Sequence, residues 1–224
     1  MKIVIFDVDG VLLDSLSPHL RICLDLANEY DLNISIPSKK KFKNEIVRKH
    51  IKISPMYDFF VSVGFLPDKA KEATKYYDEN FNKLYGAKMF NGIEAMIHNL
   101  KEDGFDLGIV TSNVRQNILP PLQTVLTYFE DDAILTYDDP KFGKNKEEAI
   151  DSVIDSIAFH KQEERIDPKQ IWYIGDQWKD HQAANKAGVN FIGVTYGWCI
   201  AETDYARFPI ANNPEELYNI LTGN

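Results

Sequence analysis

The stretch that decides the fold of this chain is Phe6-Asp7-Val8-Asp9-Gly10-Val11-Leu12-Leu13-Asp14-Ser15. It continues an apolar, β-branched run at residues 3–6, a pattern that is typical of a strand buried on both faces of a parallel sheet. The run stops at Asp7, so an acidic side chain stands where the strand ends. Ligands of open α/β sheets collect at the carboxyl ends of strands, which makes this position a candidate for a functional site.

The remaining apolar runs predict the other strands of the sheet, at residues 105–111, 133–135, 171–175 and 191–195. Helical patterns alternate with them at residues 93–101, 114–126, 147–159 and 178–187. Asn91 and Asn145 stand where caps of the first and third of these helices are expected, and Gly188 marks the end of the fourth. This alternation predicts an α/β fold with a doubly wound, Rossmann-like parallel sheet.

Residues 15–87 interrupt the alternation, because they contain no convincing strand. Helical patterns fill them instead, at residues 18–30, 39–50, 55–63 and 68–84. An all-helical block inserted directly after the first strand predicts a separate domain. We therefore expect a catalytic core of residues 1–14 and 88–224 and a helical cap domain of residues 15–87.

Composition narrows the classes of function. The chain has 224 residues and a net charge of −9, with 34 acidic against 25 basic residues, which argues against a nucleic acid as a scaffold partner. The two cysteines are too few and too far apart for a disulfide framework or a zinc cluster. We find neither a signal peptide nor a membrane span in the sequence and expect a soluble cytoplasmic protein. The oligomeric state is not predictable from these features.

Three strand ends carry acidic or hydroxyl side chains. The first strand is followed by Asp7 and Asp9, and the other two ends carry Thr111-Ser112-Asn113 and Gly175-Asp176, with Asp180 one helical turn later. Any one of these is more simply a turn residue. Together they bring carboxylates into one crevice, where each close pair repels by about 4 kcal/mol at an effective dielectric near 20. The cluster therefore predicts a cation, and its hard oxygen ligands favour Mg²⁺.

Other motifs fit less well. The stretch from Asp7 opens like a calcium loop, but Val11 takes a ligand position and Pro18 stands where the closing Glu is needed. Lys144 is followed by Asn145 instead of the Ser or Thr of a phosphate-binding P-loop. The sequence contains no G-x-S-x-G nucleophile elbow and no G-x-G-x-x-G.

The opening stretch resembles the first motif of the haloacid dehalogenase superfamily. It is most similar to the branch of phosphoglycolate phosphatase and β-phosphoglucomutase, in which a helical cap follows that motif. Ile109-Val110-Thr111-Ser112-Asn113 resembles the second motif, and Gly175-Asp176-Gln177-Trp178-Lys179-Asp180 resembles the fourth. The resemblance extends over essentially the whole chain and is weak in the cap.

The resemblance implies a role for each acidic residue. Asp7 would be the nucleophile that forms an aspartyl-phosphate, and Asp9 would protonate the leaving oxygen and then activate water. Mg²⁺ would be held by Asp7, the backbone carbonyl of Asp9 and Asp176. Asp180 would bind the ion through water or support the other ligands.

The resemblance also implies groups that bind the transferring phosphoryl group. Thr111, Ser112 and Asn113 would contribute a hydroxyl and neighbouring backbone amides. The third family motif is a lysine, for which this chain lacks the usual Lys-Pro-x-Pro and offers Lys141, Lys144 and Lys146. We predict Lys144, because it directly precedes the expected helix cap Asn145, and expect solvated loop charges at the other two positions.

A magnesium-dependent phosphatase acting on a small phosphorylated metabolite is the function that these features favour. Asp9 supports phosphoryl transfer, because dehalogenases of the superfamily need no acid at that position. A β-phosphoglucomutase-like sugar phosphomutase uses the same pair of aspartates and remains an alternative, as does a non-catalytic binding or regulatory protein. The basic run at residues 39–52 is expected to be a solvated helix face, with attraction of an anionic substrate as a second hypothesis. His19 lies just after the cap hinge and could reach the substrate, although we expect it to pack or to face solvent.

Overall fold

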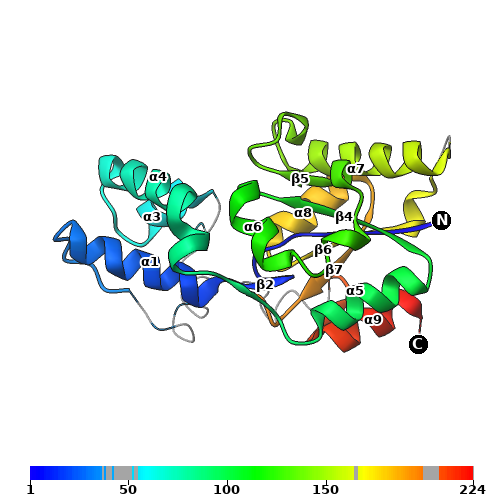
Figure 1. Ribbon diagram of the computed structural model, residues 1–224, viewed down its shortest axis with the longest axis horizontal. Helices are drawn as coiled ribbons and strands as arrows, with labels where there is room; N and C mark the ends of the chain where they lie inside the picture. The colour runs from blue at the N-terminus through cyan, green and yellow to red at the C-terminus, as the bar shows by residue number, and fades with distance from the viewer. Residues whose placement is uncertain are drawn as a thin grey trace.

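The computed structural model describes residues 1–36, 38, 42, 52, 55–163, 166–198 and 207–223. Its main sheet has six strands: β1 (Lys2–Phe6), β4 (Phe105–Thr111), β5 (Ile134–Thr136), β6 (Ile171–Gly175), β7 (Asn190–Val194) and β8 (Ile210–Ala211). Their order is β5-β4-β1-β6-β7-β8, and every pair of neighbours is parallel (Figure 1). The predicted doubly wound α/β fold is confirmed, and β8 is a strand that the sequence pattern did not predict.

The first strand lies at the centre of the sheet, where the direction of winding reverses. Phe6, its last residue, pairs with Ile109 of β4 on one side and with Ile174 of β6 on the other. Along the chain the sheet grows from β1 to β4 and β5, and then on the opposite side to β6, β7 and β8. The carboxyl ends of β1, β4 and β6 are therefore adjacent at the switch point, where ligands of such sheets bind.

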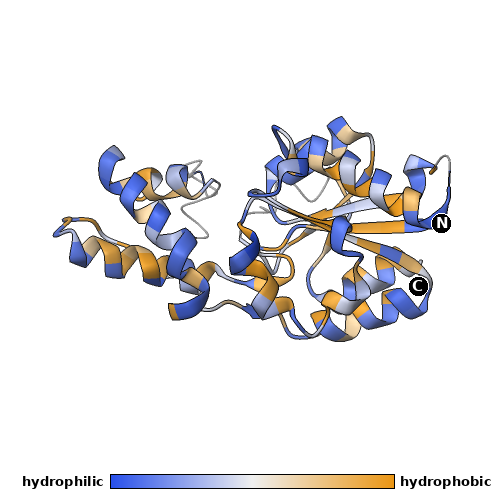
Figure 2. Ribbon diagram, turned by 45° about the horizontal axis from the view of Figure 1, so that its top comes forward, coloured by the Kyte–Doolittle hydropathy of each residue, from blue (hydrophilic) through white to orange (hydrophobic). Residues whose placement is uncertain are grey.

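Helices cover both faces of this sheet. On one face lie α7 (Lys146–Lys161) and α8 (Trp178–Ala187), and on the other lie α5 (Ile93–Glu102) and α9 (Pro214–Thr222) (Figure 1). Successive residues of β1 serve the two faces in turn, since Ile3 and Ile5 belong to the core under α7 whereas Val4 and Phe6 belong to the opposite core. Figure 2 shows the apolar residues concentrated along the strands and hydrophilic residues on the outward sides of the helices. Full burial of one large apolar side chain stabilises the folded protein by about 1.5–3 kcal/mol.

Three further helices lie beside the sheet as a group: α1 (Leu16–Glu29), α3 (Met56–Ser62) and α4 (Pro67–Leu84) (Figure 1). We call them the helical group. Phe59, Phe60 and Phe65 are buried, and they belong to the same hydrophobic cluster as Val4 and Phe6 of β1. The two connections between this group and the sheet pair as short antiparallel strands, β2 (Leu13–Asp14) and β3 (Lys88–Met89), which the sequence pattern did not predict.

The predicted helix at residues 39–50 and most of the basic run lie outside the described residues. The division into residues 1–14 with 88–224 and residues 15–87 stays a prediction. Within the described part of the chain, no helix is long and apolar enough to span a membrane.

Helix ends follow local sequence in most places. The Asn145 side chain caps α7 by accepting the Glu148 N–H at 3.0 Å, and α8 ends at Gly188, as predicted. The expected cap Asn91 is wrong, because α5 begins after Gly92 at φ +91°. The helix predicted at residues 114–126 is shorter, α6 (Arg115–Leu122), and contains two prolines. The remaining helical turns are 3₁₀ segments at Leu126–Tyr128, Asp131–Ala133, Pro140–Phe142 and Pro168–Gln170.

Candidate active site

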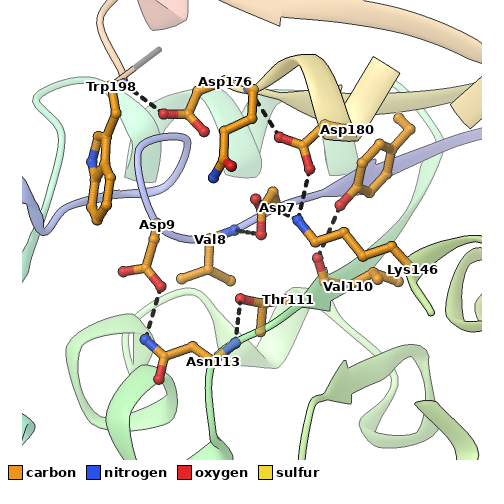
Figure 3. A network of polar contacts seen from close by, with 12 residues as sticks. Asp7, Val8, Asp9, Val110, Thr111, Asn113, Lys146, Asp176, Asp180 and Trp198 are labelled. Atoms are coloured by element: carbon orange, nitrogen blue, oxygen red, sulfur yellow. Dashed lines mark hydrogen bonds and ion pairs between the residues drawn. The ribbon is translucent and has the colours of Figure 1, made fainter. Parts of the chain in front are cut away.

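The ends of three neighbouring strands deliver polar side chains to one place (Figure 3). Asp7 follows β1, Thr111 is the last residue of β4, and Asp176 follows β6. Their exposed fractions are 3%, 1% and 0%. A mostly apolar strand ends at or directly before each of them and holds the backbone in the sheet, so these polar groups are fixed at its edge.

Asp7 is held from two sides. Its Oδ1 accepts the Val8 backbone N–H at 2.8 Å, and its Oδ2 lies 2.7 Å from Lys146 Nζ. Burial raises the pKa of Asp7 to about 7; the nearby charge of Asp180 adds to the rise, whereas the Lys146 ammonium opposes it. A bound cation would favour the ionised, nucleophilic form of this carboxylate in the same way as the lysine does.

The lysine at the site is Lys146, and the prediction of Lys144 is wrong. Lys146 is the first residue of α7, and its ammonium reaches both Asp7 Oδ2 and Asp180 Oδ1 at 2.7 Å. Lys144 precedes the cap Asn145; its side chain is exposed and its backbone N–H donates to Glu148 Oε2 at 2.9 Å. The helix therefore begins at the sequence position that was expected, but its first turn carries the later lysine over the sheet edge.

Neighbouring carboxylates keep the Lys146 side chain protonated. Burial alone lowers the pKa of this lysine, but the carboxylates of Asp180 and Asp7 outweigh burial and hold the pKa well above its ordinary value. Its ammonium also lies 5.9 Å from the centre of the Tyr173 ring. The site thus contains a permanent cation beside the candidate nucleophile.

The arrangement of carboxylates fits a divalent cation. Asp7, Asp176 and Asp180 each offer an oxygen, and these atoms lie within 4.8 Å of one another. Asp176 Oδ2 accepts the Trp198 backbone N–H at 2.5 Å, whereas its Oδ1 is buried and has no hydrogen-bond partner among the described residues. Burial raises the pKa of Asp176 well above its usual range, and the charges of Asp180 and Asp7 add to the rise. Three carboxylates around one ammonium leave negative charge to be balanced, and hard oxygen ligands suit Mg²⁺.

Asp180 takes a supporting position in this group. Its Oδ1 accepts from Lys146, and its Oδ2 accepts the Gln177 backbone N–H at 3.0 Å at the start of α8. Both oxygens are thus occupied by the protein. The contacts favour a residue that positions the lysine over one that binds the ion directly.

Asp9 turns its side chain away from the carboxylate group. Its Oδ2 accepts from Asn113 Nδ2 at 2.8 Å, and the same nitrogen donates to Tyr77 Oη at 3.0 Å. The Asn113 backbone N–H donates to Thr111 Oγ1 at 3.2 Å, which leaves the Thr111 hydroxyl hydrogen available for a ligand. Since the amide hydrogens of Asn113 are donated within the protein, its side chain holds Asp9, a role that differs from the predicted binding of phosphate.

Asp7, Asp9, Thr111, Asn113 and Lys146 line a cavity of about 40 Å³, whereas Asp176 and Asp180 are not among its lining residues. The sequence pattern singled out many of its lining residues, including Asp7, Asp9, Thr111 and Ser112, but it gave no role to Met56, Tyr77, Gln177 and Trp198. Gln177 stands inside the stretch quoted for the fourth motif, and no local pattern marks Met56 or Tyr77. A second, neighbouring cavity of about 420 Å³ shares the lining residues Ser112, Lys146 and Gln177 with the first. Lys144 lines this second cavity.

Comparison with known proteins agrees with this geometry. Residues 4–194 match the family model described as haloacid dehalogenase-like hydrolase. The chain is 23% identical to a phosphoglycolate phosphatase of Salmonella typhi over 96% of this chain and 88% of that protein. It is 25% identical to the pyrophosphatase PpaX of Bacillus velezensis over 86% and 82% of the two chains.

Solved structures show the same fold. A haloacid dehalogenase-like hydrolase from Streptococcus pneumoniae superposes with a TM-score of 0.75 at 21% identity and covers 98% of both chains. At that level of sequence identity, the similarity shows the fold alone.

Proposed function

This chain belongs to the haloacid dehalogenase-like hydrolases, and we propose that it is a magnesium-dependent phosphatase of small phosphorylated metabolites. The observation that carries the proposal is the placement of Asp7 and Asp9 on one cavity with Lys146 and Thr111. A nucleophile, an acid, a cation and a hydroxyl donor then surround the space that a phosphoryl group needs. The likeness to a phosphoglycolate phosphatase and a pyrophosphatase supports the same class of reaction.

In the first half of the reaction, a carboxylate oxygen of Asp7 attacks the phosphorus of the bound ester. The new bond from this oxygen to phosphorus forms as the bond from phosphorus to the ester oxygen breaks. Asp9 gives its proton to the departing oxygen, so an alcohol leaves instead of an alkoxide. The product on the protein is an aspartyl-phosphate at residue 7.

In the second half, water attacks the phosphorus of the aspartyl-phosphate. Asp9, now a carboxylate, accepts a proton from this water, and the bond between phosphorus and the Asp7 oxygen breaks. Inorganic phosphate leaves, and both aspartates return to their starting forms. The same residue thus serves as acid in one step and as base in the next.

The phosphoryl oxygens carry negative charge throughout both steps. Lys146 and the Thr111 hydroxyl are proposed to bind them, together with Ser112 and the backbone amides near it. Asp7, Asp176 and the Asp9 carbonyl would hold Mg²⁺, which supplies the positive charge that lets an anionic substrate approach an anionic nucleophile. Asp180 holds Lys146 in place through its 2.7 Å contact.

We also propose that residues 15–87 act as a cap over this site. His19 and Tyr77, which line the cavity, come from α1 and α4 of the helical group, and Met56 comes from α3. The β2–β3 pair holds together the two connections through which the chain enters and leaves this group. A cap so placed would select the group attached to the phosphate.

A panel of phosphorylated metabolites tests the proposed function. Phosphoglycolate, sugar phosphates, nucleotides and pyrophosphate would each be assayed for phosphate release with and without Mg²⁺, and Asp7→Asn is the control. We expect Mg²⁺-dependent release from at least one member and none above background from the variant. Release that Asp7→Asn retains, or silence across the whole panel, would contradict the proposal.

A further inference from the structure

A chain of buried hydrogen bonds joins Asp9 to the helical group. Asn113 Nδ2 bridges Asp9 Oδ2 and Tyr77 Oη, and Tyr77 Oη lies 2.9 Å from His19 Nε2. His19 Nδ1 in turn lies 2.5 Å from the Ser15 carbonyl oxygen. The exposed fractions of His19, Tyr77 and Asn113 are 2%, 1% and 8%, so water competes little for these groups.

In this series of hydrogen bonds, the donor and the acceptor of each bond can be assigned in only one way. The Ser15 carbonyl can only accept, so His19 Nδ1 carries a hydrogen, and the neutral ring then presents Nε2 as an acceptor. Tyr77 must donate its hydroxyl hydrogen to that nitrogen and accept from Asn113. The Asn113 amide is oriented to match, because its Oδ1 accepts the Val114 N–H at 2.8 Å.

The protonation states of the two aromatic residues agree with this order. Burial raises the pKa of Tyr77 well above its ordinary value, so the hydroxyl keeps its hydrogen. Burial lowers the pKa of His19, so the ring stays neutral and Nε2 keeps its lone pair. Neither group is in a state that would reverse the direction of the chain.

The consequence for Asp9 is that its two oxygens differ. Oδ2 is occupied by the Asn113 amide, whereas Oδ1 is buried and accepts no hydrogen bond from the described residues. An oxygen that already accepts an N–H is the poorer place for a proton. Oδ1 is therefore the oxygen that is left to carry a proton for a leaving group.

We propose that Tyr77 is a positioning residue: its hydroxyl fixes the Asn113 amide, and through it the Asp9 carboxyl, so that Oδ1 faces the leaving oxygen. This inference rests on the proposed phosphatase function. It makes proton donation depend on a residue of α4, which lies outside the sheet and 36 positions from Asn113 in the sequence. Proton donation is then efficient only while α4 is docked against the strand end that carries Asn113.

The alternative is that Tyr77 only fills space. Its ring packs against His19 and Phe81 at centroid distances of 5.2 and 4.6 Å, contacts that Phe would also make. Tyr77→Phe thus removes the hydroxyl and keeps the ring. Tyr76→Phe is the matched control, because Tyr76 is the next residue on α4 and lines neither the cavity nor the chain of hydrogen bonds.

The test compares two substrates of Tyr77→Phe: an aliphatic phosphate monoester from the active panel, whose alkoxide needs a proton, and p-nitrophenyl phosphate, whose leaving group needs none. The rate compared is that of the first release of the leaving group, before the aspartyl-phosphate is hydrolysed, because the base role of Asp9 in the second half is common to both substrates. For the aliphatic ester we expect this rate to fall by about tenfold or more, which is part of what acid catalysis supplies. For p-nitrophenyl phosphate we expect it to change by less than about threefold, and Tyr76→Phe should leave both rates unchanged. Inhibition by inorganic phosphate, a readout of the binding site without turnover, should be the same in all three proteins.

Equal loss with both substrates, or no loss with either, would overturn the inference. Asn113→Ala interrupts the same chain at its other end and should reproduce the difference between the substrates; if Tyr77→Phe does not fold, this variant decides alone. A wild-type protein that hydrolyses no ester, or an active Asp7→Asn, would instead signal failure of the proposed function itself.

Discussion

Lys146 Nζ lies 2.7 Å from Asp7 Oδ2 and at the same distance from Asp180 Oδ1, so one ammonium group bridges the carboxylates that follow two neighbouring strands. The contact is made by the first residue of α7, immediately after its cap Asn145. It ties the start of a helix to the candidate nucleophile on β1. The position of this helix thus determines where the positive charge of the site lies.

Replacement of this lysine should abolish most of the activity. We expect Lys146→Met to lower kcat by about 10²–10³, the loss typical of removing one preorganised group that stabilises transition-state charge. Lys144→Met is the matched control, since Lys144 is exposed and two positions away, and it should stay within a few-fold of wild type. Steady-state phosphate release by both variants checks this. A greater loss of activity in Lys144→Met than in Lys146→Met would show that Lys144, the residue predicted from the sequence, is the functional lysine.

Mg²⁺ should stabilise the folded protein in the absence of substrate. At one hundred times its Kd, an ion that binds only the folded state adds about 2.7 kcal/mol, which for a chain of this size raises Tm by about 5–10 °C. Asp176→Asn should abolish this increase, because it removes the buried carboxylate whose Oδ1 has no partner among the described residues. The variant should also melt higher than wild type without Mg²⁺, because less negative charge is buried. Thermal unfolding with and without the ion measures both effects, and an unchanged Mg²⁺ response in Asp176→Asn would exclude this residue as a ligand.

Gly10 should be irreplaceable for a reason that goes beyond backbone strain. It has φ +82°, and a Cβ at this position would lie 2.1 Å from Asp176 Oδ2. Gly104 has a similar φ of +78° but open space around it, so it reports the strain alone. We expect Gly104→Ala to cost about 1 kcal/mol with normal activity. Gly10→Ala should in addition displace Asp176 and weaken Mg²⁺ binding, which titration of the Tm with Mg²⁺ would show; equal effects of the two variants would refute this account.

Asp78 on α4 should make stability depend on pH. Burial raises its pKa to about 6 from 3.8, and the charges of Asp138 and Glu79 add to the rise. An acid whose pKa is raised by folding binds its proton more tightly in the folded state, so stability should rise as pH falls from about 6 towards 4. Because the group is half-buried, solvent screening reduces the effect to about 1 kcal/mol.

Asp78→Asn isolates this contribution. The variant should be more stable than wild type by about 1 kcal/mol at pH 8, with the difference vanishing near pH 4. Glu72→Gln is the control on the same helix, because Glu72 is exposed, pairs with Lys69 at 2.8 Å and is not among the charges that raise the pKa of Asp78. Urea unfolding at several pH values measures the differences. A constant difference between Asp78→Asn and wild type across this range would contradict the raised pKa.

The sheet and its polar edge could be predicted from sequence because their signals are local. Mostly apolar runs of four to seven residues marked most strands. The polar side chains of the candidate site stand at the end of such a run or directly after it, as Thr111 and Asp7 do. β8, with two residues at Ile210–Ala211, is too short to leave such a signal. The same holds for the β2–β3 pair, which exists only because two distant segments meet.

The misses at the site have a common physical cause. Lys144 and Lys146 flank the same helix cap, and only the direction of the first turn of α7 decides which ammonium reaches Asp7. Tyr77 reaches Asn113 through tertiary packing of α4, which no spacing in the sequence encodes. Local patterns thus predicted which strand ends carry the polar side chains of the candidate site, whereas contacts between elements determined the partners of those residues.

The central claim is that Asp7 becomes phosphorylated during turnover. Rapid acid quenching of wild-type protein with an active substrate and Mg²⁺, followed by mass spectrometry of its peptides, tests this directly. We predict a transient phosphate, labile to hydroxylamine as an acyl phosphate should be, on Asp7 of the peptide that contains Asp7-Val8-Asp9, and none in Asp7→Asn. Phosphate on a different residue, or turnover at a normal rate by Asp7→Asn, would contradict it.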